Sequence, residues 1–90
     1  MKPRYPGDHA KFRAVLDGEY SWPCEYMFKF IVPKDSVFKV EALFPGHAIS
    51  FRDSRNGNYV SATIVLEADS ADLIIAIYEQ AAQIEGLIAL

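Results

Sequence analysis

The chain has 90 residues, of which 51% are hydrophobic, so it is long enough for one small folded domain and too apolar for a disordered segment. Its single cysteine, Cys24, excludes an internal disulfide and a cysteine-based zinc site, which fits a reducing compartment. The net charge of −3 gives no general attraction to nucleic acid, and no apolar run is long enough to cross a bilayer, so we predict a cytoplasmic protein without nucleic-acid or membrane partners.

Residues 1–22 are predicted to precede the main domain. Residues 1–7 contain two prolines and a glycine, which is typical of a flexible tail. Residues 8–22 are expected to form a short helix and an extended linker, with Asp8 as the N-cap of the helix and Gly18 at its C-terminal cap. One stripe of this helix is apolar and consists of Phe12, Val15 and Leu16.

In two segments every second residue is apolar and the residues between are of mixed character, which is typical of strands with one buried face. They cover residues 24–32 and 58–67, and a weaker alternation over residues 47–53 precedes the second of them. Between the last two segments, Arg55-Asn56-Gly57 predicts a tight hairpin turn, because Asn and Gly tolerate the backbone angles that such turns require. The apolar sets are Tyr26, Phe28, Phe30 and Val32 in the first strand and Val60, Ala62, Ile64 and Leu66 in the last, while Ile49 and Phe51 oppose Ser50 and Arg52 in the weaker one.

Two helices are predicted between these strands and the end of the chain. The first is short, begins at Asp35 or Ser36 and stops at Pro45-Gly46. The second begins with Asp69 as its N-cap and Asp72 in the capping-box position, and it runs to about residue 84. The apolar stripes are Val37, Phe38, Val40, Leu43 and Phe44 in the first helix and Ile74, Ile77, Tyr78, Ala81 and Ile84 in the second.

The predicted chain order defines the fold class. Gly86 closes the last helix, and residues 87–90 are expected to form a short final strand. Two right-handed βαβ crossovers joined by a hairpin give an α+β, ferredoxin-like βαββαβ sandwich over residues 23–90. Its antiparallel sheet should have the strand order 4-1-3-2, with both long helices on one face and an extra short helix at the N-terminus.

Several short segments follow the pattern of one family. They are Asn56-Gly57-Asn58-Tyr59-Val60-Ser61 in the last long strand, Ile77-Tyr78-Glu79 and Gln83-Ile84-Glu85 in the last helix, and Trp22-Pro23 and Lys29 upstream. On these residues the chain, from about residue 20 to its end, resembles the YbeD-like family of small bacterial proteins of unknown function. Gly57, Asn58, Tyr59, Ser61 and Tyr78 are the positions that carry the resemblance most directly.

Finer details of the chain extend that resemblance. The stretch Tyr26-Met27-Phe28-Lys29-Phe30 and the ending Ile84-Glu85-Gly86-Leu87-Ile88 look like the Bacteroidetes branch of the family. The resemblance implies a ferredoxin-like fold similar to the ACT regulatory domains of amino-acid metabolism. The chain departs from the family in the helix after the first strand, which is cut short at Pro45-Gly46.

No grouping of residues in the sequence is typical of a catalytic site. The loop Val32-Pro33-Lys34-Asp35 lacks the glycine of a phosphate-binding loop, although Arg52 or Arg55 leaves open an anion-directed hydrolase. His9 and His47 lie on different predicted elements, which argues against a metal site. We therefore expect a protein that is not an enzyme and that has neither a metal nor a cofactor.

The sheet face turned away from the helices is the candidate interaction surface. It is more apolar than a purely solvated face needs to be, and it combines an aromatic ring and a methionine with hydrogen-bonding groups. We therefore predict a regulatory or protein-interaction module that forms a homo-oligomer or binds a partner protein. The predicted face consists of Met27, Lys29, Ile31, Tyr59, Ser61, Thr63 and Val65.

Three alternatives stay open. The N-terminal helix could fold back over that face and hide it. An ACT-like sensor could bind an amino acid or another small metabolite at the turn that holds Lys34 and Asp35. Because every Lys and Arg lies at or before Arg55, the acidic last helix could also be a charged partner surface or simply a solvated one.

Overall fold

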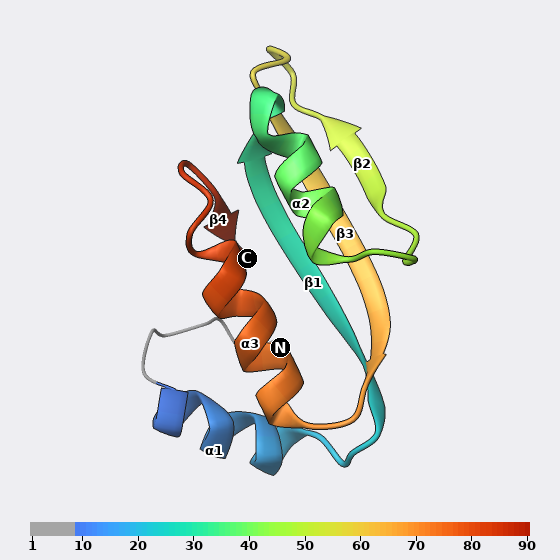
Figure 1. Ribbon diagram of the computed structural model, residues 1–90, viewed down its shortest axis with the longest axis vertical. Coiled ribbons are helices and arrows are strands. Elements are labelled where there is room, and N and C mark those ends of the chain that lie inside the picture. Colours follow the sequence, from blue (N-terminus) through green and yellow to red (C-terminus); the bar gives the residue numbers. More distant parts are fainter. Residues whose placement is uncertain (1–8) are drawn as a thin grey trace.

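Two long antiparallel strands form the centre of the molecule. In the computed structural model, which describes residues 9–90, β1 (Cys24–Pro33) and β3 (Tyr59–Ala68) pair over their whole length. The short strands β2 (Ser50–Asp53) and β4 (Ile88–Ala89) add to the outer edges of β3 and β1, so the sheet order is β2-β3-β1-β4 (Figure 1). The predicted order 4-1-3-2 is confirmed, and with it the ferredoxin-like α+β fold.

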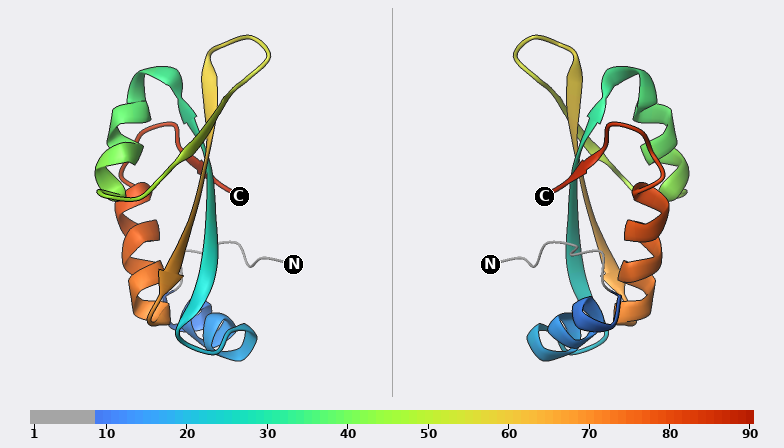
Figure 2. Two further views of the ribbon diagram at one scale, coloured as in Figure 1. Left: turned by 90° about the vertical axis from the view of Figure 1, so that its right-hand side faces the viewer. Right: turned by 90° about the vertical axis from the view of Figure 1, so that its left-hand side faces the viewer.

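Two helices cover one face of this sheet and leave the other face open (Figure 2). A single 3-10 turn, η1 (Lys34–Ser36), leads from β1 into α2 (Val37–Leu43), and α3 (Ala71–Ala81) follows β3. Every second residue from Tyr26 to Val32 in β1 and from Val60 to Ala68 in β3 faces these helices and is 0–8% exposed. All of the inward residues predicted for β1 and β3 are among them: Tyr26, Phe28, Phe30, Val32, Val60, Ala62, Ile64 and Leu66.

Aromatic rings fill the space between β1 and the helices. Phe28 packs against Tyr78 of α3 with 5.2 Å between the ring centroids, and against Phe44 after α2 with 5.5 Å. Tyr26 continues this cluster along β1, with its ring centroid 5.0 Å from that of Phe28. The strand alternation therefore concentrates large rings on one face, where edge-to-face and tilted contacts add to burial.

The helix α1 (His9–Glu19) packs on α3 at one end of the molecule and does not lie over the open face (Figures 1 and 2). Phe12 is buried with its ring 5.5 Å from that of Tyr78. Arg13 forms an exposed ion pair with Asp72, and His9 lies 3.8 Å from Glu79. The alternative in which this helix covers the open face is therefore not adopted.

The structure corrects three details at the N-terminus. Gly18 lies inside α1 and not at its cap, because the helix continues through Glu19 and the amide of Tyr20 still donates to the carbonyl of Leu16 at 2.9 Å. Val15 is 45% exposed, so only Phe12 and Leu16 form the buried stripe. The predicted cap Asp8 and the predicted tail of residues 1–7 lie outside the described residues.

The boundaries of α3 also differ from the prediction. Ser70, and not Asp69, caps this helix: its hydroxyl accepts a hydrogen bond from the amide of Leu73 at 3.3 Å. Both residue types are good caps, and the choice follows from β3, which extends to Ala68 and delays the helix by one residue. The helix ends at Ala81 and gives way to turns, yet Ile84 remains buried as predicted.

Two further elements are shorter or more exposed than predicted. The strand β2 begins at Ser50 and not at His47, so the chain reaches the sheet edge only after a loop. In α2, which has seven residues, Val40 is buried while Phe38 is 62% exposed. Such a short helix turns a narrow side toward the sheet, which leaves part of the predicted stripe in solvent.

Glycines permit the two tight turns next to the sheet. Gly57 has a φ of +76° in the β2–β3 hairpin, where the amide of Ser54 also donates to the carbonyl of Tyr59 at 2.8 Å. Gly86 has a φ of +81° between α3 and β4, and a Cβ at this position would lie 2.8 Å from the Pro33 ring. A side chain would therefore strain the backbone at both glycines and would also clash at Gly86.

Candidate functional site

The open face is the side of the sheet turned away from α2 and α3. The alternation of each strand and the register between strands decide which side chains it carries. All seven residues predicted for this face lie on it, and the structure adds residues from both edge strands. Within residues 9–90 the open face consists of Glu25, Met27, Lys29, Ile31, Ser50, Arg52, Tyr59, Ser61, Thr63, Val65, Glu67 and Ile88.

Two pairs of side chains on the open face are apolar, one on each side of Lys29 along β1, and we call them together the apolar half. Met27 and Val65 lie opposite each other on β1 and β3, and each is 47% exposed. Ile31 lies opposite Ile88 of β4, which is 52% exposed. None of these side chains is covered by a helix of the described chain (Figure 2).

The other part is polar, and we call it the polar half. Lys29 lies opposite Thr63, and Thr63 lies opposite Ser50 at the β2 edge. One row further along, Ser61 lies opposite Arg52. These five side chains surround a shallow hollow of about 290 Å³, to whose lining Phe51 also contributes.

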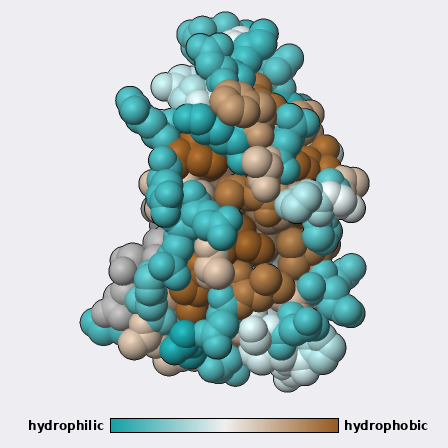
Figure 3. Space-filling model, viewed as in Figure 1, coloured by the Kyte–Doolittle hydropathy of each residue, from teal (hydrophilic) through white to brown (hydrophobic). Residues whose placement is uncertain are grey.

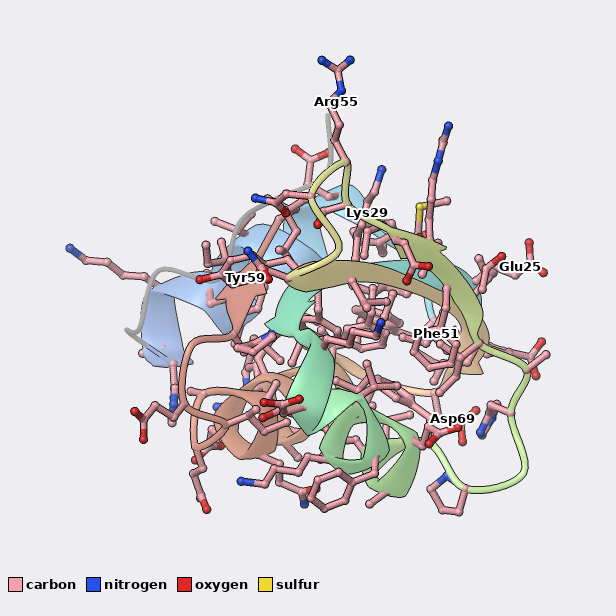
Figure 4. The ribbon with its side chains drawn as sticks, turned by 90° about the horizontal axis from the view of Figure 1, so that it is seen from above. Glu25, Lys29, Phe51, Arg55, Tyr59 and Asp69 are labelled. Atoms are coloured by element: carbon pink, nitrogen blue, oxygen red, sulfur yellow. The ribbon has the colours of Figure 1, made fainter. Side chains whose placement is uncertain are left out.

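Lys29 and Arg52 are the charged groups of that hollow. Both are exposed, and neither forms an ion pair within residues 9–90. Lys29 points away from the helices, whereas Phe51 lies on the helix side of β2 (Figure 4). The polar half therefore presents two positive charges and three hydroxyl groups without a carboxylate among them.

The open face ends in a pair of acids. Glu25 and Glu67 lie directly opposite each other at the start of β1 and the end of β3, and both are exposed. Like charges in this position repel each other. The open face is thus divided along the strands into an acidic end and a basic centre.

A second hollow lies on the helix side of the molecule. It measures about 390 Å³, and it opens between α2, α3 and β3. Apolar side chains gather in the middle of this side (Figure 3). This hollow exists because α2 ends early and leaves a gap in the helical layer. The hollow is lined by the apolar residues Leu43, Phe44, Leu66, Leu73, Ala76 and Ile77, and by the polar residues His47, Glu67 and Gln80.

The residues that carry the family resemblance have separate places. Gly57 and Asn58 belong to the hairpin, and Tyr59 and Ser61 lie on the open face. Tyr78 is instead buried, and its hydroxyl lies 3.1 Å from that of Tyr26. Burial raises the pKa of both phenols, because removal from water penalises the ionised form. Tyr78 is thus part of the core and does not extend the surface.

The remaining predicted positions do not converge on one site. Lys34 and Asp35 are exposed on η1, and the backbone amide of Lys34 donates to the carbonyl of Asn58 at 3.0 Å. Neither residue lines the two hollows described above. Arg55 projects from the hairpin tip toward the same side of the sheet as Lys29 (Figure 4). It does not line the hollow of the polar half, whereas Arg52 does.

Metal-binding residue types are scattered over the described chain. Within residues 9–90, no group of three His, Cys, Asp or Glu side chains is close enough to hold a metal ion. Cys24 is partly exposed at the start of β1. His47 lies in the turn after α2, where its Nδ1 is 3.3 Å from the carbonyl of Pro45.

The sequence interpretation missed five members of the open face: Glu25, Ser50, Arg52, Glu67 and Ile88. The alternation of β2 places Ser50 and Arg52 on the same side, but it does not say which residues of β3 they meet. The hairpin register supplies that information, since it sets Arg52 beside Ser61 and Ser50 beside Thr63. To place Ile88 on the open face, the register between β4 and β1 must likewise be known.

Comparison with known proteins places most of the chain in one family. A family model described as "Protein of unknown function (DUF493)" matches residues 17–90, which include all of the sheet and the helices α2 and α3. The comparisons with curated proteins and with solved structures gave no match. None of the helices within residues 9–90 combines the length and the apolar character needed to cross a membrane.

Proposed function

The chain belongs to this DUF493 family of proteins of unknown function, and from that premise we propose that it is a non-enzymatic interaction module that buries the apolar half of its open face against another protein chain. That chain is either a second copy or a distinct partner. The observation that carries the proposal is the exposed pair Met27 and Val65 on a sheet face without a covering helix, with a second apolar pair, Ile31 and Ile88, on the other side of Lys29 along β1. Exposed apolar side chains on one face of a small domain are typical of protein interfaces.

The composition of the face supports the same proposal. Tyr59 is 43% exposed at the start of β3, and aromatic and Met side chains are enriched at interface centres. Glu25 and Glu67 at one end of the face would form part of the polar rim. Regulation through such a face is consistent with the family resemblance to ACT domains, which work by pairing.

Two other functions have weaker support. An ACT-like sensor at Lys34 and Asp35 lacks a hollow among those described at these residues. An anion-directed hydrolase at Arg52 would need a general base to activate one of the hydroxyls around it, and within residues 9–90 the lining of that hollow contains no His, Asp or Glu. Arg55 does not line either of the two hollows described above. Both alternatives therefore remain predictions of the sequence.

Met27→Glu is the variant that tests the proposal most directly. It places a charge in the apolar half, and burial of that charge in an interface would be costly. Val15→Glu is the matched control, because Val15 is equally apolar and 45% exposed but lies on α1. Sedimentation velocity over a concentration series should show association of the wild type and of Val15→Glu, and a monomer for Met27→Glu.

A monomeric wild type would point to a distinct partner instead of a second copy. The three proteins would then serve as baits in lysate of the source organism. A partner that binds the wild type and Val15→Glu but not Met27→Glu would support the proposal. A monomeric wild type whose captured proteins are the same for all three baits would overturn it.

A further inference from the structure

We propose that the polar half of the open face is a binding site for a small phosphate-type dianion. The site is the hollow between Lys29, Ser50, Arg52, Ser61 and Thr63, and its ligand is free phosphate or the phosphoryl group of a small monoester. This inference goes beyond the proposed protein interaction and does not depend on it, because it uses different side chains of the face.

The charge of the hollow selects an anion. Lys29 and Arg52 bring two positive charges to one hollow of a protein whose net charge is −3. Neither has an ion-pair partner within residues 9–90. The nearest acids of the open face are Glu25 and Glu67, and the pair Met27 and Val65 lies between them and Lys29. Two uncompensated cations match a dianion better than a single carboxylate.

The hydroxyl groups make the hollow more than a pair of surface charges. Ser61 and Thr63 are half-buried on the central strand β3, and Ser50 faces Thr63 from β2. None of the three hydroxyls has a side-chain hydrogen bond within residues 9–90. They are free to donate to oxygen atoms of a ligand, while the Arg52 guanidinium presents its planar fork of N–H groups.

The size and the scaffold of the hollow narrow the ligand class further. A volume of about 290 Å³ is at the lower end for small-molecule sites, so it fits a phosphoryl group with a short substituent and not a nucleotide. All five polar residues are on β1 and β3 or directly paired with β3 in the sheet, and regular strands hold side chains more precisely than loops do. The hollow is therefore pre-arranged around one tetrahedral anion.

NMR titration of the ¹⁵N-labelled full chain tests the proposal. The probes are inorganic phosphate and glycerol 3-phosphate, with chloride at matched ionic strength as the reference for non-specific screening. We expect saturating shifts at residues 29, 50–52 and 61–63, with a dissociation constant of about 1 mM or tighter. Arg52→Gln and Lys29→Gln should each weaken binding about tenfold, because each removes a charge-assisted contact.

Arg55→Gln is the matched control, since Arg55 carries the same charge at the hairpin tip but lies outside the hollow. It should keep the wild-type affinity, and the spectra themselves report whether each variant is folded. Saturation with phosphate alone would identify the free ion as the ligand, and saturation with the monoester alone would identify a phosphorylated metabolite. Met27→Gln, which places a polar but uncharged group in the apolar half, should weaken the protein interaction and keep phosphate binding, so loss of the protein interaction and loss of the anion site can be told apart.

The proposal is overturned if phosphate and the monoester produce only the linear shifts that chloride produces. It is equally overturned if Arg55→Gln weakens binding as much as Arg52→Gln, because the effect would then come from net charge and not from the hollow.

Discussion

The two faces of the central strands differ more than any other two regions of the molecule. Along β1, Phe28 is fully buried while its neighbour Met27 is 47% exposed. Along β3, Ile64 is fully buried and Val65 is 47% exposed. Adjacent residues of similar character thus have opposite environments, and the period of the strand alone decides which is which.

This difference separates the residues that make the fold from those available for function. The helix-covered face is closed by rings from β1 and α3 and by Phe44, which follows α2, whereas the open face combines an apolar half with a polar half. A substitution on the first face should act on stability, and a substitution on the second should act on binding. The three predictions below test that division, from the largest expected effect to the smallest.

The largest difference in the effect of a substitution on the free energy of unfolding is expected between Phe28 and Met27. Phe28→Ala should lower the free energy of unfolding by about 3–5 kcal/mol, because it removes a ring that packs against Phe44 and Tyr78 and leaves a cavity. Met27→Ala should change it by less than about 0.5 kcal/mol, since this side chain is half-exposed. Urea denaturation followed by circular dichroism measures both values.

A domain of this size could be unfolded outright by Phe28→Ala, so Phe28→Leu provides a second measurement. It keeps most of the apolar volume and should cost about 1–2 kcal/mol, still more than Met27→Ala. Equal effects of substitutions at positions 27 and 28 would show that the division between the two faces is wrong.

Regular periodicity explains why so much of the fold was predictable from the sequence. Ten-residue strands such as β1 and β3 repeat the alternation often enough to fix both their existence and their inward faces. Element ends depend on fewer residues. Asp69 and Ser70 are both good caps, and only the length of β3 selects Ser70.

The candidate site was predictable only in part, for a related reason. The alternation of each strand placed Lys29, Ser61 and Thr63 on one face. That Lys29 and Arg52 lie in the same hollow can be predicted only when the register between β1, β3 and β2 is known. Registers depend on long-range packing and on the hairpin geometry. They are not expressed in the local pattern of any one segment.

The buried pair Tyr26 and Tyr78 should make the stability of the helix-covered face depend on pH. Burial raises the pKa of Tyr26 and Tyr78 above the ordinary value of 10.0, so the folded protein keeps both protons after the unfolded chain has lost them. The stability from these neutral phenols is complete below pH 10 and is lost as pH rises further. Each buried tyrosine should lower the free energy of unfolding by about 1.4 kcal/mol per pH unit in that range.

Tyr78→Phe tests this assignment. It should cost about 1 kcal/mol at neutral pH, where the hydrogen bond to Tyr26 is lost, and it should make the alkaline decline less steep. Tyr59→Phe, on the open face, is the control for loss of a hydroxyl. The same alkaline slope in the wild type and in Tyr78→Phe, measured by urea denaturation at several pH values, would contradict the prediction.

The smallest effect is expected from the acidic end of the open face, where Glu25 lies opposite Glu67. Glu67→Lys should raise the free energy of unfolding by about 0.5 kcal/mol, because it turns a repulsive cross-strand pair into an attractive one. Adding Glu25→Lys to this variant restores a like-charge pair and should cancel the gain. The effect should shrink as salt is raised, since both side chains are exposed. A gain that survives the double substitution would come from net charge and not from this pair, and the open face would then influence stability in a way that its strand register does not explain.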